Sequence, residues 1–179
     1  MSPETNLILI GYRACGKTAV GGRLARRLNR PFVDLDQVLV EEAGQSIADI
    51  VAQYGWPEFR RREKELVARY GKKQGLVLAP GGGAVLDPDN VKALKEHGII
   101  VWLTADPATI QKRLAQDRAT EANRPSLTGA DTLNEVEKVL KEREPLYQKA
   151  AQITIDTTHQ SLETTTNQIL AAVGALKDG

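Results

Sequence analysis

One short segment near the amino terminus limits what this chain can fold into more than any other feature. Residues 11–18 read Gly-Tyr-Arg-Ala-Cys-Gly-Lys-Thr and match the pattern G-x-x-x-x-G-K-S/T, known as the P-loop. An apolar run precedes the segment, and Val20, Leu24 and Leu28 follow it at helical spacing. This order of strand, loop and helix separates a nucleotide-binding loop from an ordinary glycine turn, so we expect the chain to bind a nucleotide.

The loop combines three kinds of phosphate-binding group. Its backbone N–H groups precede a helix, Lys17 supplies a mobile charge for the β- and γ-phosphates, and the Thr18 hydroxyl offers an oxygen ligand for Mg²⁺. The nucleotide-binding residues predicted here are Gly11, Tyr12, Arg13, Ala14, Cys15, Gly16, Lys17 and Thr18.

Length and composition favour one soluble domain. The chain has 179 residues, with 24 basic and 23 acidic side chains, so neither nucleic acid nor an anionic membrane is expected as the main partner. A single cysteine excludes an internal disulfide and suits a reducing cytosol. The first six residues lack a basic run, and the apolar run after them is too short for a signal peptide or a membrane span. We therefore expect a cytoplasmic protein.

Five short apolar runs alternate with helical patterns along the chain. This alternation predicts a parallel sheet with helices on both faces, whose ligand lies beyond the carboxyl ends of the strands. The runs are 7–10, 32–33, 77–79, 99–103 and 153–155.

Two carboxylates follow the second apolar run. In an extended segment Asp34 and Asp36 would point the same way, so that one could face Mg²⁺ and the other a substrate hydroxyl. Either residue could instead cap a helix that begins near Gln37, and the two roles can coexist.

Two later motifs lie where a substrate could bind. The arginine triplet 60–62 lies in a helical segment that begins after Gly55. Because successive side chains of a helix point in different directions, at most one or two of the three can line a pocket. For an arginine run alone, a solvated helix face is the simpler interpretation. Gly81, Gly82 and Gly83 directly follow the third apolar run. They could form a flexible turn, but we favour close approach of their backbone to a substrate.

Two arginines near the end of the chain are candidates for binding an anion. Arg124-Pro125 lies in the polar stretch 117–131, which we interpret as a lid that closes over phosphate. Arg143 falls on the apolar stripe of the following helix, where a charge needs an anion. That anion could be a ligand or a protein carboxylate such as Asp36, and the side chain could also extend to solvent.

Together these residues resemble the shikimate kinase family. The resemblance rests on the P-loop, Asp34-x-Asp36, Gly55-x-x-x-Phe59-Arg60-x-x-Glu63, the three glycines, Arg124-Pro125 and Arg143-x-Pro145-Leu146-Tyr147, in order along nearly the whole chain. It implies a P-loop NTPase fold of the nucleoside-monophosphate-kinase type, with a five-stranded parallel sheet in the order 2-3-1-4-5. It also implies one domain, 1–179, with a substrate-binding region at about 36–65 and a mobile lid at about 115–130.

The implied activity is transfer of the ATP γ-phosphoryl group to the 3-hydroxyl of shikimate, with Mg²⁺, by a monomer. Lys17, Asp36 and Arg124 would be catalytic, and Thr18 and Asp34 would hold the metal. Asp36, Arg60, Glu63, Gly81, Gly82, Gly83 and Arg143 would bind shikimate. Arg113 and Arg124 would join the P-loop in binding ATP, with the loop 157–159 near the adenine. The alternatives are a gluconate-type kinase and a nucleotide-gated binding protein without catalysis.

The P-loop departs from the family pattern at Ala14 and Cys15, where Gly followed by Ser or Ala is usual. If position 14 needs a positive φ, alanine adds strain of about 1 kcal/mol. Cys15, between a lysine and a helix N-terminus, could be a reactive thiol, although selection for small size is the simpler explanation.

Overall fold

The computed structural model describes residues 2–116, 125–127 and 135–176. Its centre is one sheet of five parallel strands in the order β2-β3-β1-β4-β5, which confirms the expected order. Leu7 of the central strand lies opposite Val77 on one side and Ile99 on the other. The strands are β1 (Asn6–Ile10), β2 (Phe32–Asp34), β3 (Val77–Ala79), β4 (Gly98–Thr104) and β5 (Ile153–Asp156).

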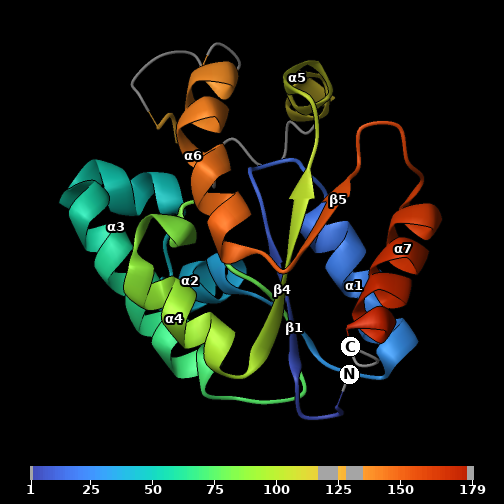
Figure 1. Cartoon of the computed structure of the whole chain (residues 1–179). Helices are drawn as coiled ribbons and strands as arrows, with labels where there is room; N and C mark the ends of the chain where they lie inside the picture. The colour runs from blue at the N-terminus through green and yellow to red at the C-terminus, as the bar shows by residue number, and fades with distance from the viewer. Residues whose placement is uncertain (1, 117–124, 128–134, 177–179) are drawn as a thin grey trace.

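Helices cover both faces of the sheet, with α1 and α7 on one side and α2, α3 and α4 on the other, while α5 lies beyond the strand ends (Figure 1). The helices are α1 (Lys17–Leu28), α2 (Leu35–Ala43), α3 (Ile47–Gly71), α4 (Pro88–Glu96), α5 (Pro107–Gln116), α6 (Val136–Ala150) and α7 (Leu162–Ala175), with a 3₁₀ turn η1 (Ala84–Leu86).

The apolar run of β1 is continuous because both faces of this strand are buried. Successive side chains of a strand point to opposite faces. Ile8 and Ile10 therefore join the core beneath α2, α3 and α4, whereas Leu7 and Leu9 join the core beneath α1 and α7. All four are buried, as expected for the central strand of a parallel sheet between two helical layers.

A third apolar cluster connects the P-loop to the helices beyond the carboxyl ends of the strands. Tyr12 of the loop is buried in it against Ile110 of α5 and Val136, Val139 and Leu140 of α6. This packing places α5 and α6 beside the loop, where the ligand was expected.

The boundaries of α3 follow local signals in the sequence. Ser46 caps the helix, with its hydroxyl accepting a hydrogen bond from the Asp49 N–H at 3.1 Å. Gly55 interrupts the helix with φ 81° and ψ 168°, as its position suggested, and helical geometry resumes directly after it. The break orients the second half of α3 independently of the first.

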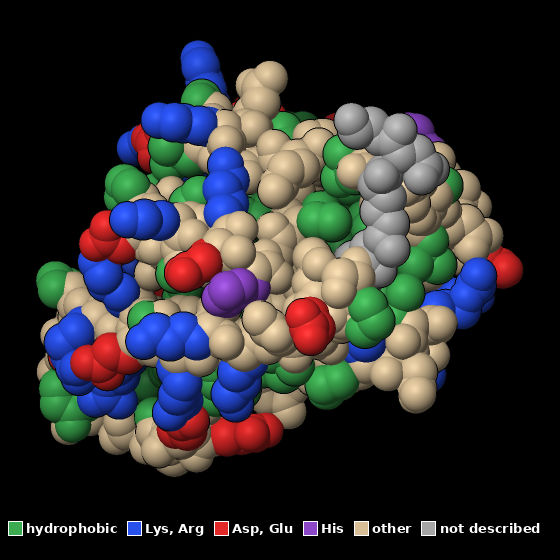
Figure 2. Space-filling view, turned by 60° about the horizontal axis from the view of Figure 1, so that its bottom comes forward, with side chains coloured by type: hydrophobic (Ala, Val, Ile, Leu, Met, Phe, Trp, Pro, Cys, Tyr) green, Lys and Arg blue, Asp and Glu red, His purple; other side chains and the backbone are tan. Residues whose placement is uncertain are grey.

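Charged side chains are mixed on the face shown in Figure 2, where Lys and Arg alternate with Asp and Glu. This mixture matches the formal net charge of +1. In the part of the chain that the structure describes, no helix is both long enough and apolar enough to cross a membrane.

Candidate active site

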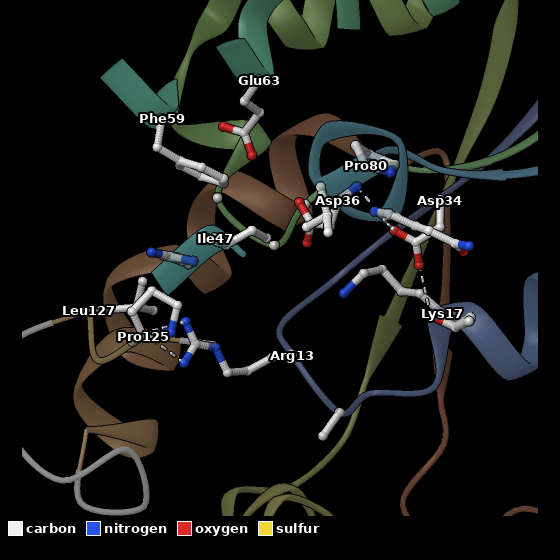
Figure 3. A pocket seen from close by; sticks show the side chains of 18 of the residues that line it. Arg13, Lys17, Asp34, Asp36, Ile47, Phe59, Glu63, Pro80, Pro125 and Leu127 are labelled. Atoms are coloured by element: carbon white, nitrogen blue, oxygen red, sulfur yellow. Dashed lines mark hydrogen bonds between the residues drawn. The ribbon is translucent and has the colours of Figure 1, made fainter. Parts of the chain in front are cut away.

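A cavity of about 580 Å³ opens at the carboxyl edge of the sheet, between the P-loop, the first turn of α2, the second half of α3 and α6 (Figure 3). It brings together residues that are far apart in the sequence. The predicted site residues that line it are Arg13, Ala14, Gly16, Lys17, Thr18, Asp34, Asp36, Arg60, Glu63, Gly81, Gly82, Gly83, Arg113 and Arg143.

The P-loop has the conformation that its glycines allow. Gly11 and Gly16 have φ values of 143° and 103°. A Cβ on Gly11 would lie 2.3 Å from the carbonyl oxygen of Leu103, so only glycine fits there. Lys17 Nζ donates hydrogen bonds to the carbonyl oxygens of Gly11 and Tyr12 at 2.8 and 2.9 Å, which holds the ammonium group inside the curve of the loop.

Ala14, at the crown of the loop, has φ 60°. The left-handed conformation brings its Cβ close to the following carbonyl and is unfavourable by about 1 kcal/mol or more. This confirms the strain expected for alanine at this position. Because the loop contains Ala14 in this conformation, the contacts around the residue stabilise it against the strain.

Tyr12 and Cys15, two of the predicted nucleotide-binding residues, do not line the cavity, and their predicted binding role rests on the backbone of the loop. Both side chains are buried, Tyr12 in the cluster with α5 and α6 and Cys15 against β1 and β4. Gly11 also lies outside the lining. Because the Cys15 thiol has no exposed surface, the structure contradicts an accessible reactive thiol and favours selection for small size.

The two carboxylate oxygens of Asp34 have different partners, and one of them has the capping role that the position of this residue suggested. One oxygen accepts hydrogen bonds from the backbone N–H groups of Asp36 and Gln37, at 3.1 and 3.4 Å, and so caps α2. The other accepts from the Thr18 hydroxyl at 2.9 Å. The two oxygen groups predicted for a metal are therefore neighbours beside the P-loop, and hard oxygen donors of this kind suit Mg²⁺.

Asp36 reaches the cavity by a different route from the one expected. The extended segment ends at Asp34 and α2 starts at Leu35, so Asp36 lies in the first turn of the helix and does not alternate along a strand. Burial raises the pKa of Asp36 to about 6, and the charges of Asp34 and Glu63 act in the same direction, against those of Lys17 and Arg60.

The three glycines after β3 make room for charged side chains. A Cβ on Gly81 would lie 2.6 Å from Glu63 Oε1 and 2.7 Å from Asp36 Oδ1, and a Cβ on Gly83 would overlap the Arg60 guanidinium group. None of the three has a positive φ. Their absence of side chains is therefore explained by this close packing, and all three also line the cavity.

Arg60 is oriented by three neighbours on α3. Its Nη1 donates to Glu63 Oε2 at 2.7 Å, and its guanidinium group lies over the rings of Trp56 and Phe59. Glu63 is almost fully buried, which raises its pKa, and its second carboxylate oxygen has no hydrogen-bond partner within residues 2–116, 125–127 and 135–176. Arg61, in contrast, is exposed and pairs with Glu58, so one arginine of the triplet lines the cavity, as helix geometry required.

Arg143 is buried at the wall of the cavity, which contradicts extension of its side chain to solvent. Its guanidinium group hydrogen-bonds the hydroxyl of Tyr147, which in turn donates to the carbonyl oxygen of Gly82 at 2.5 Å. Among the described residues, no carboxylate lies within ion-pair distance of Arg143, so the predicted alternative of a salt bridge to Asp36 is not formed. A buried cation facing a cavity favours an anionic ligand.

Arg113 lines the cavity from α5 and supports the P-loop. It donates to the carbonyl oxygen of Thr157 at 2.7 Å and to that of Ala14 at 3.3 Å, which joins the loop after β5 to the P-loop. Arg124, and most of the predicted lid at 115–130, lie outside the described residues. Of the segment around Pro125, residues 125–127 are described, and Pro125 and Leu127 line the cavity.

Sequence reasoning missed the apolar part of the cavity wall. Several residues without a predicted role line the cavity, namely Val40, Ile47, Trp56, Pro80, Ala19, Gln37 and Phe59. The amphipathic pattern around Ile47 indicates burial but cannot separate a side chain in the core from one beside a cavity. The break at Gly55 was the one local signal that this region is shaped for a ligand.

The P-loop at the carboxyl edge of a parallel sheet with this strand order gives the protein the P-loop kinase fold, and Arg60 and Arg143 line the cavity beside the loop. The family model described as "Shikimate kinase" matches residues 13–174. The chain belongs to the shikimate kinase family.

Relatives and solved structures agree with this family. The chain is 43% identical to a shikimate kinase of Syntrophus aciditrophicus over 93% of this chain and 90% of that protein. It is 42% identical to one of Symbiobacterium thermophilum, with 92% and 94% covered. The structure of a shikimate kinase from Acinetobacter baumannii in complex with shikimate is 33% identical and superposes with a TM-score of 0.89, over 97% of this chain and 95% of that one.

We predict that Ala14→Gly stabilises the protein, because glycine relieves the strain at φ 60°. The free energy of unfolding, measured by urea denaturation, should rise by about 0.5–1 kcal/mol, since the greater entropy of glycine in the unfolded chain offsets part of the gain. Ala19→Gly, in the exposed first turn of α1, is the matched control and should lower the free energy of unfolding by about 1 kcal/mol. Equal destabilisation by both variants would contradict the strain.

We predict that Asp36→Asn stabilises the unliganded protein above pH 6. The folded-state pKa of Asp36 lies above its ordinary value of 3.8, so the ionised carboxylate destabilises the fold as the pH rises from about 4 to about 6. The variant should be more stable by about 1–2 kcal/mol at pH 7, and the difference should vanish below pH 4. Denaturation curves at pH 4, 6 and 7.5 measure this, and a difference independent of pH would contradict it.

Proposed function

We propose that this protein transfers the γ-phosphoryl group of ATP to the 3-hydroxyl of shikimate, forming shikimate 3-phosphate and ADP. The family match and the relatives named shikimate kinase support this activity. The observation that carries it in this chain is the buried Arg143, which lines the same cavity as Arg60 and the P-loop. Two planar guanidinium groups suit bidentate binding of a carboxylate, the anionic group of shikimate.

On the acceptor side, we assign Arg60 and Arg143 to the shikimate carboxylate, with Glu63 orienting Arg60. Asp36 hydrogen-bonds the reacting hydroxyl and accepts its proton. With a pKa of about 6, the Asp36 carboxyl group is mostly ionised at neutral pH, and the carboxylate is still basic enough to receive a proton. The backbone of Gly81, Gly82 and Gly83 borders the same space and contacts the ring hydroxyls.

On the nucleotide side, we assign the P-loop backbone and Lys17 to the phosphates of ATP. Thr18 and Asp34, whose oxygens are 2.9 Å apart, would hold Mg²⁺, which neutralises phosphate charge during transfer. Arg113 borders the nucleotide, and Arg124 is proposed, from its sequence motif, to bring further positive charge to the transferring group. Phosphoryl transfer depends mainly on positioning and charge, which these groups supply.

The remaining expectations are proposals of the same kind. We propose one domain, a substrate-binding region at about 36–65, a lid at about 115–130 and a monomer whose partners are ATP and shikimate. Trp56, Phe59, Arg60 and Glu63 of the proposed substrate-binding region line the cavity, which supports that boundary. The single cysteine is a free thiol, which suits the reducing cytoplasm where we expect the reaction.

The activity is tested by ADP release from ATP and Mg²⁺ with shikimate, gluconate, a nucleoside monophosphate or no acceptor. We expect turnover with shikimate well above the reaction without acceptor. Faster turnover with gluconate would support the gluconate-type alternative. ATP binding without acceptor-dependent ADP release for any compound would support a nucleotide-gated binding protein and would overturn the proposal.

We predict that Arg143→Lys raises the KM for shikimate about tenfold or more while changing the KM for ATP less than threefold. Lysine keeps the charge but cannot copy a planar, bidentate contact with a carboxylate. Steady-state kinetics with each substrate varied in turn measures both constants. Arg61→Lys, at an exposed arginine of α3, is the control and should change neither. Equal increases in both constants for Arg143→Lys would count against the carboxylate role.

A further inference from the structure

Arg13, at a variable position of the P-loop, lies over the Tyr12 ring within the loop and also contacts two segments outside it. Both of its Nη atoms donate to the carbonyl oxygen of Pro125 at 3.2 Å (Figure 3). Nη1 also lies 3.6 Å from Oε1 of Glu135, the residue directly before α6. Arg13 therefore joins the P-loop to two segments that are distant in the sequence.

Glu135 completes the connection through its other carboxylate oxygen. Oε2 accepts a hydrogen bond from the backbone N–H of Leu127 at 2.8 Å and one from the Ser126 hydroxyl at 3.0 Å. One oxygen of Glu135 thus faces the P-loop arginine, and the other is bound to the 125–127 segment. Ser126, between Pro125 and Leu127, thus has a partner in this carboxylate.

Burial makes this connection different from a surface ion pair. The side chain of Glu135 is 0% exposed and that of Arg13 is 14% exposed. Removing one member of a buried pair takes a countercharge away from the other and destabilises the arrangement much more than loss of an exposed pair does. Arg23 and Glu163 lie at the same 3.6 Å but are 32% and 66% exposed, so they form a matched control within the chain.

The 125–127 segment is part of the cavity wall, because Pro125 and Leu127 line the cavity beside Arg13. Its position relative to the P-loop therefore influences how well water is excluded from the phosphates and how the phosphates are oriented. We propose that Arg13 and Glu135 are positioning residues that couple the P-loop to the 125–127 segment, and that Arg13 is not primarily a ligand of ATP. For its effect on catalysis, this inference rests on the proposed kinase activity.

Two substitutions test the coupling. Arg13→Met removes the bonds to Pro125 and the ion pair. Glu135→Gln keeps an acceptor oxygen for Leu127 and Ser126 but places an N–H donor opposite the guanidinium group of Arg13. We expect each to lower kcat about tenfold, with the KM for shikimate unchanged, and we expect the double variant to lose little more than either single one. Arg13→Lys, which keeps the charge, should retain more activity than Arg13→Met.

The exchange rate of the Leu127 amide hydrogen, followed by NMR, tests the same coupling without any substrate. We expect exchange at least about fivefold faster in Arg13→Met, because the partner of Leu127 then loses its own anchor. Glu163→Gln should change neither exchange nor kinetics. Unchanged Leu127 exchange in Arg13→Met would overturn the coupling.

The kinetic result can also overturn the proposal. If Arg13 is an ATP ligand, Arg13→Met should raise the KM for ATP by the same factor in the wild-type and Glu135→Gln backgrounds. The losses of activity of the two single variants should then multiply to about a hundredfold in the double variant. Failure of the kinase activity itself would be recognised separately, because the exchange measurement does not depend on turnover.

Discussion

Three carboxyl groups of this protein converge at the carboxyl edge of one sheet, and the arrangement of the site depends on the cations placed among them. Asp36 and Glu63 both lie against Gly81, and Asp34 lies close enough to raise the pKa of Asp36. Such crowding is tolerated only where cations are near, and Lys17 and Arg60 favour the ionised form of Asp36. This balance suits a phosphoryl-transfer site, because the cavity then presents both a carboxylate and an ammonium group to its ligands.

The sheet produces this concentration of charge through its topology. All five strands are parallel, so the segments after β1, β2 and β3 emerge at the same edge. The P-loop, Asp34 and the three glycines are those segments. Helix α3 adds Arg60 and Glu63 after its break at Gly55, and α6 adds Arg143, which is connected to Gly82 through Tyr147. Arg60, Arg143 and residues of the P-loop thus line one cavity.

Much of this arrangement could be predicted from the sequence, because it follows from periodicity and from the parallel sheet. The strand runs and a helix cap from the Asp34-x-Asp36 segment were expected on local grounds, and strain at Ala14 was expected from its departure from the family pattern. The position of Asp36 in the first turn of a helix was not expected, because the short strand β2 gives no sign that α2 begins at Leu35. Burial of Tyr12 depends on α5 and α6, and the partner of Arg13 is a carboxylate far along the chain. Such contacts between distant segments leave no periodic signal in a single sequence.

The central claim is that Arg60 and Arg143 hold the acceptor carboxylate while Asp36 faces the reacting hydroxyl. A crystal structure of the protein with shikimate, ADP and Mg²⁺ tests this most directly. The account predicts that the carboxylate lies within hydrogen-bonding distance of both guanidinium groups, and that the 3-hydroxyl lies within hydrogen-bonding distance of the Asp36 carboxylate. A shikimate carboxylate bound elsewhere, with Arg143 still lacking an anion, would contradict it.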